Sequence, residues 1–100
     1  QGLAGKVVVT GGDGELAAMK RIAEGTQTMT ILKPSEKIAG AAAEAIDAFL
    51  SGGTPAWTGT VDNGAGEINA ALVDMITITA ENLQSEIIDA GIFTAEEINE

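Results

Sequence analysis

One acidic and one basic residue stand at positions where α/β proteins commonly bind ligands. Asp13 follows a β-branched run at residues 6–10 and two glycines, and Lys33 ends a second apolar run 20 residues later. Ligands of open α/β sheets bind beyond the carboxyl ends of the strands. A carboxylate accepts hydrogen bonds from neighbouring hydroxyl groups, and an ammonium group donates up to three. Together these two side chains suit a polar, hydroxyl-rich ligand.

Each of the two residues also has a purely structural explanation. A helix is expected directly after Asp13, and aspartate is among the best helix N-cap residues. Lys33 precedes Pro34, and a solvated lysine before a proline turn is an ordinary arrangement. From these residues alone, both the structural and the ligand-binding explanations stay open.

Several kinds of chemistry are excluded by composition. The chain has no histidine and no cysteine, so we expect no metal site of the usual ligands and no Ser–His or Cys–His catalysis. The glycines at 11, 12 and 14 do not follow the nucleotide-binding spacing G-x-G-x-x-G, and no Gly-Lys-Ser/Thr follows them. A formal net charge of −10 would repel a polyanion, so nucleic acid is not an expected partner. We expect no cofactor.

The pattern of apolar residues predicts an α/β fold with a parallel sheet flanked by helices. Strands are predicted at 6–10, 28–32 and 73–79, the first of them buried. Helices are predicted from Asp13 to Gly25, from Ser35 to about Ser51, from Glu81 to Gly91, and as a short last helix capped by Thr94. The longest helix is expected to bury an apolar stripe that comprises Ile38, Ala41, Ala42, Ala45, Ile46, Phe49 and Leu50.

The chain is expected to form about three strands and three to four helices. Three strands make a thin sheet, and so few helices cover little of its two faces. The chain also starts at Gln1 without a methionine, so we expect it to be part of a larger fold. Residues 56–71 are glycine-rich and show only a turn signal at Asp62-Asn63-Gly64. Trp57 lies in this stretch; its ring could stack on the face of a ligand, but packing against the protein is the favoured interpretation.

One segment resembles a known family. Residues 9–18 (VTGGDGELAA), residues 25–30 (GTQTMT) and Lys33-Pro34 resemble the periplasmic-type (type I) sugar-binding proteins of ABC importers, in the branch that takes xylose and related aldoses. The Asp62-Asn63-Gly64 turn, Asn82 and Gly91 also stand where that family has comparable residues. Two departures are Gly12, where the family often has glutamine, and Asn69-Ala70, which replaces a frequent Val-Pro.

The resemblance implies the C-terminal part of a two-lobe sugar-binding protein that performs no catalysis. Residues 1–33 and about 73–100 would belong to the C-terminal lobe, and about 34–72 would cross to the N-terminal lobe. Asp13 and Lys33 would contact the sugar between the lobes. The implied partners are a monosaccharide such as xylose, the membrane permease and the remaining part of the protein, in a periplasmic or extracellular location with a lipid anchor as one option.

Two other functions stay open at this level. The effector-binding domain of a sugar-responsive transcription regulator shares the two-lobe fold. An enzyme fragment of flavodoxin-like or Rossmann-like fold is disfavoured by the missing phosphate loop and the missing histidine.

Overall fold

The computed structural model describes residues 1–100, which form two compact units. The first unit comprises Gln1–Lys33 and Met75–Glu100, and the second comprises Pro34–Asp74. The chain therefore leaves the first unit after Lys33 and returns to it at Met75. None of its helices has the length and apolar character that crossing a membrane requires.

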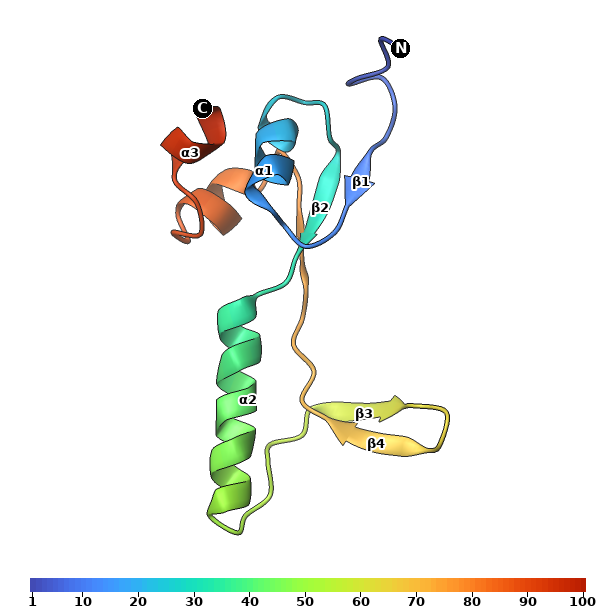
Figure 1. Ribbon diagram of the computed structural model, residues 1–100, viewed down its shortest axis with the longest axis vertical. Coiled ribbons are helices and arrows are strands. Elements are labelled where there is room, and N and C mark those ends of the chain that lie inside the picture. Colours follow the sequence, from blue (N-terminus) through green and yellow to red (C-terminus); the bar gives the residue numbers. More distant parts are fainter. The chain divides into compact units, whose positions relative to one another are not determined.

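The first unit is built on a three-stranded mixed sheet. Its strands are β1 (Thr10–Gly11), β2 (Met29–Leu32) and β5 (Ile76–Ile78), in the order β1-β2-β5. β1 lies beside β2 (Figure 1) and runs parallel to it, but β5 runs antiparallel to β2. The α/β class is confirmed, and the sheet contains the predicted parallel pairing in β1 and β2 together with one antiparallel strand, β5, whose direction was not predicted. The chain leaves at the carboxyl end of β2 and returns beside it, with Leu32 opposite Ile76, so β5 must run back along β2.

The predicted buried strand at residues 6–10 is also wrong. Only Thr10 and Gly11 join the ladder, and Val8 is 78% exposed. β1 is an edge strand of this sheet, and the valines before it lack the cover on both faces that buried parallel strands have. Val9 is attached to the sheet by its backbone, since its carbonyl accepts from the Thr28 amide at 2.8 Å and its amide donates to the Thr28 hydroxyl at 3.1 Å.

The helices of the first unit pack with its sheet around one apolar core. α1 (Leu16–Ala23) packs beside α3 (Ala95–Asn99), as Figure 1 shows. A short π-helix, η1 (Gln84–Ile88), replaces most of the helix predicted from Glu81. These elements and the sheet together bury Met19, Ile22, Leu32, Ile78, Leu83, Ile87 and Ile98.

The second unit contains α2 (Ser35–Leu50) and a β-hairpin (Figure 1). The hairpin pairs β3 (Gly59–Asp62) with β4 (Glu67–Ala70) in antiparallel register. Its turn confirms the signal at Asp62-Asn63-Gly64, because the Asp62 carboxylate accepts from the Gly64 amide at 2.8 Å and the Asn63 carbonyl oxygen accepts from the Ala65 amide at 3.0 Å. The two strands themselves were not predicted.

The predicted burial of the α2 stripe is wrong for this chain. No side chain of α2 is buried, and Leu50 is 83% exposed. An amphipathic helix buries its stripe only against another layer, and the second unit supplies little beyond the Trp57 ring, whose centroid lies 6.3 Å from that of Phe49. Trp57 thus packs against the protein, as favoured from the sequence.

The capping box of α3 makes a pH-dependent contribution to stability. The Thr94 amide and hydroxyl donate to the Glu97 carboxylate at 2.8 and 2.9 Å, and these bonds hold the pKa of Glu97 below its usual value of 4.5. A lowered folded-state pKa stabilises the fold above the unfolded-state pKa, and this stabilisation is lost as the pH falls through the folded-state pKa.

We therefore expect Glu97→Gln to lower the melting temperature more at pH 7 than at pH 3, because the stabilisation by the ionised carboxylate is lost as the pH falls through its lowered pKa. Thermal unfolding followed by circular dichroism across this range measures the difference. Glu96→Gln, which removes a neighbouring carboxylate not bonded to Thr94, is the matched control. A Glu97→Gln deficit that is the same at both pH values would contradict the role of the ionised carboxylate.

Candidate functional site

The turn between β1 and α1 has an uncommon backbone conformation. Asp13 has φ +76° and Gly14 has φ +64°, so two successive residues adopt left-handed geometry. Among residues with a Cβ, aspartate and asparagine tolerate this region best. Asp13 is the only non-glycine residue of the chain with positive φ. Backbone strain of this kind is concentrated at functional sites.

Gly14 brings the turn into direct contact with β2. Gly14 is buried, and a Cβ built on it would lie 2.9 Å from Leu32 Cδ1 and 3.1 Å from Leu32 Cα. Gly12, in contrast, faces open space, since a Cβ there would meet nothing within 4 Å. The turn is therefore fixed to β2 on one side and open on the other.

The structure brings Asp13 and Lys33 together as an ion pair. Lys33 Nζ lies 2.5 Å from Asp13 Oδ1, with 59% of the lysine side chain and 62% of the aspartate side chain exposed. Exposed pairs contribute about 0–1 kcal/mol, so this pair does little to hold the fold. Both charged groups instead remain accessible to a ligand.

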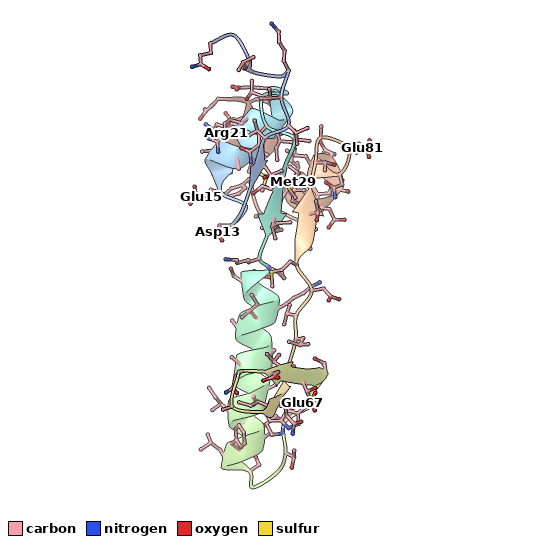
Figure 2. All side chains as sticks on the ribbon, turned by 90° about the vertical axis from the view of Figure 1, so that its right-hand side faces the viewer. Asp13, Glu15, Arg21, Met29, Glu67 and Glu81 are labelled. Carbon is pink, nitrogen blue, oxygen red and sulfur yellow. The ribbon has the colours of Figure 1, made fainter.

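The N-cap explanation of Asp13 is wrong. The N-cap residue of α1 is Glu15, and no side chain caps the helix there. Figure 2 shows Asp13 ahead of the first turn of α1, while Arg21 lies in its last turn at the other end of the helix. The Asp13 carboxylate thus has no capping role, and it pairs with the Lys33 ammonium.

The chemistry available at this turn is recognition of polar groups. The pair presents carboxylate oxygens that accept and an ammonium that donates, which together match adjacent hydroxyl groups. No cluster of three potential metal-ligating side chains occurs in the chain. One further side chain at this turn was not predicted to be functional: Gln27, which is buried below the end of β1. Its burial is unusual for a glutamine, and the one signal in the sequence was its place in the GTQTMT block at residues 25–30.

The chain is similar in sequence to known solute-binding proteins. No family model matches the chain. The D-xylose-binding periplasmic protein of Escherichia coli (strain K12) is 38% identical over 98 residues, which cover 98% of this chain and 30% of that protein. The protein of the same name from Haemophilus influenzae is 39% identical, with the same coverage.

A solved structure shows the same fold. The carbohydrate transporter solute-binding protein of Chloroflexus aurantiacus, in complex with D-glucose, matches with a TM-score of 0.83 and 32% identity over 90% of this chain and 26% of its own. The chain thus spans about 30% of the length of the curated relatives and matches their C-terminal part. Its fold is mixed α/β and matches that of type I periplasmic binding proteins. The resemblance inferred from the sequence is confirmed.

The contact between Gly14 and Leu32 can be tested by comparing two glycines of one turn. We expect Gly14→Ala to destabilise the fold by about 1–3 kcal/mol, because it combines a left-handed backbone with a clash. Gly12→Ala, with open space around position 12, is the matched control and should change stability by less than about 0.5 kcal/mol. Urea unfolding of both variants measures the difference. Equal stabilities would show that the turn does not rest on β2.

Proposed function

We propose that this chain is part of the substrate-binding component of an ABC sugar importer, which captures a neutral monosaccharide such as xylose and delivers it to a membrane permease. The observation that carries the proposal is the exposed Asp13–Lys33 pair, held on a strained turn in a chain similar to D-xylose-binding periplasmic proteins. The names of those relatives support a periplasmic or extracellular location. Binding is reversible, and no covalent bond of the sugar is made or broken.

The pair supplies the polar contacts that a sugar needs. The Asp13 carboxylate accepts from one or two adjacent hydroxyls, and the Lys33 ammonium donates to a hydroxyl or to the ring oxygen. Hydrogen bonds to charged groups contribute about 1.5–3 kcal/mol each. In the free protein each group neutralises the other, so neither is left as an isolated charge when water is expelled from the site.

The two units correspond, in this proposal, to parts of two lobes. The first unit, with boundaries at Lys33 and Met75, would belong to the C-terminal lobe. The second unit would contribute to the N-terminal lobe. Closure of the two lobes around the sugar would supply the remaining contacts and the surface that the permease recognises. Residues 1–100 alone would then bind sugar weakly, because they carry only part of the binding shell.

Substitution of the pair in the full-length protein tests the proposal. Asp13→Asn keeps a residue that tolerates the left-handed conformation and removes the charge, and Lys33→Gln keeps a polar side chain. We expect each to weaken D-xylose or D-glucose binding by about 10- to 100-fold, the equivalent of one charge-assisted hydrogen bond. Isothermal titration calorimetry measures the affinity.

Glu24→Gln is the matched control, because Glu24 is an exposed acid of the same unit beyond the far end of α1. It should leave the affinity unchanged. If both pair variants bind sugar as tightly as the wild type, Asp13 and Lys33 are not ligand contacts. If the wild type binds none of xylose, glucose, arabinose and galactose, the proposed function is wrong.

A further inference from the structure

The side chain of Gln27 is buried and held at both ends of its amide. Only 6% of the residue is exposed. Its Oε1 accepts from Arg21 Nε at 2.8 Å, and its Nε2 donates to the Met29 carbonyl at 3.0 Å. These two bonds fix the orientation of the carboxamide, because the oxygen faces a donor and the nitrogen faces an acceptor.

The last residue of β1 rests on this carboxamide. A Cβ built on Gly11 would lie 2.7 Å from Gln27 Nε2, closer than a real Cβ approaches another heavy atom, and 3.7 Å from Gln27 Cδ. Only glycine therefore lets the β1 backbone come this near. Gly11 is opposite Thr30 in the parallel ladder, so the amide lies where β1 and β2 pair.

Arg21 holds Gln27 through its backbone as well as its guanidinium group. The Arg21 carbonyl accepts from the Thr26 amide at 2.9 Å and from the Gln27 amide at 3.1 Å. Arg21 itself lies in the last turn of α1, at the other end of that helix from Asp13 (Figure 2). Arg21 is thus connected to the turn through Gln27.

We propose that Gln27 is a positioning residue for ligand binding, whose carboxamide sets the separation of β1 from β2 at Gly11 and thereby the place of Asp13 relative to Lys33. Asp13 follows Gly11 by two residues on the β1 side, and Lys33 directly continues β2. Gly14 fixes the other end of the turn against Leu32. The inference rests on the proposed function, because it assigns Gln27 a role in sugar binding.

A double-mutant cycle in the full-length protein tests this role. Gly11→Ala should displace the turn and weaken D-xylose binding by about tenfold, and Gln27→Ala should weaken it several-fold by loosening the support. Gln27→Ala also removes the carboxamide with which the new Cβ would clash, and leaves only Thr30 Oγ1 at 3.5 Å, an ordinary van der Waals contact. The double variant should therefore bind about as well as Gln27→Ala alone, which means that the second substitution suppresses the first.

Thr30→Val is the matched control. Thr30 is fully buried on the adjacent strand, and its hydroxyl has no hydrogen-bond partner. Replacing the hydroxyl with a methyl group should leave both the fold and the sugar affinity unchanged. Calorimetry at a temperature where circular dichroism shows every variant fully folded separates positioning from stability, since a purely structural role would move the melting temperature alone.

The outcomes distinguish this inference from the proposed function. Additive losses in the double variant, or wild-type affinity in both single variants, would overturn the positioning role. If the wild type binds none of xylose, glucose, arabinose and galactose, the proposed function fails and with it the role of Gln27 in ligand binding. Amide hydrogen exchange of residues 11–14 then still shows whether Gln27 holds the turn, because exchange should rise in both single variants and not rise further in the double variant.

Discussion

The close approach of two glycines in the 11–14 turn to Gln27 and to Leu32 of β2 is the constraint on which the first unit depends. At Gly11 the backbone rests on the Gln27 carboxamide, and at Gly14 it rests on Leu32. Between these two contacts Asp13 adopts a left-handed conformation, which a turn between two fixed ends imposes. The same contacts bring α1 onto the sheet, where Met19 and Ile22 enter the core. The fold of the unit and the place of its charged pair thus have one physical cause.

The two units differ sharply in how they bury apolar surface. Every buried aliphatic side chain of the core belongs to the first unit, whereas α2 and its hairpin leave large apolar residues exposed, among them Ile46, Phe49, Val61 and Ile68. An apolar stripe at helical spacing is what a helix presents to a neighbouring layer. The longer relatives, of which this chain spans about 30%, have further chain that could form such a layer.

Features set by a few adjacent residues were predicted correctly from the sequence. Features that depend on contacts with distant parts of the fold were not. The capping box of Thr94, the turn after Asp62 and the helix ends at Gly25 and Gly91 depend on a few adjacent residues and are present as predicted. The direction of β5 depends on where the chain re-enters the first unit, which hydrophobic periodicity does not encode. Residues 6–10 and α2 would be buried only if a neighbouring layer of helices or strands packed against them. The apolar periodicity of the sequence assumes such a layer, and this chain does not supply it. Asp13 and Lys33 could be predicted as candidate site residues because each follows the end of a predicted strand. Gln27 is identified as a candidate by its burial and its two hydrogen bonds in the structure.

Under the proposed function, support and recognition are separate in this turn, and that separation indicates where ligand preference can change. Gly11 and Gly14 have no room for a side chain, so substitution there disturbs the backbone. Gly12 has nothing within 4 Å of a Cβ, and it is the position where the family that this chain resembles often carries glutamine. A side chain at position 12 would therefore leave the support intact while adding a polar group next to Asp13. The exposed ion pair contributes little to folding, so it too is free to vary with the ligand. Selectivity is accordingly expected to change through positions 12, 13 and 33, while 11, 14 and 27 keep the geometry that makes those changes effective.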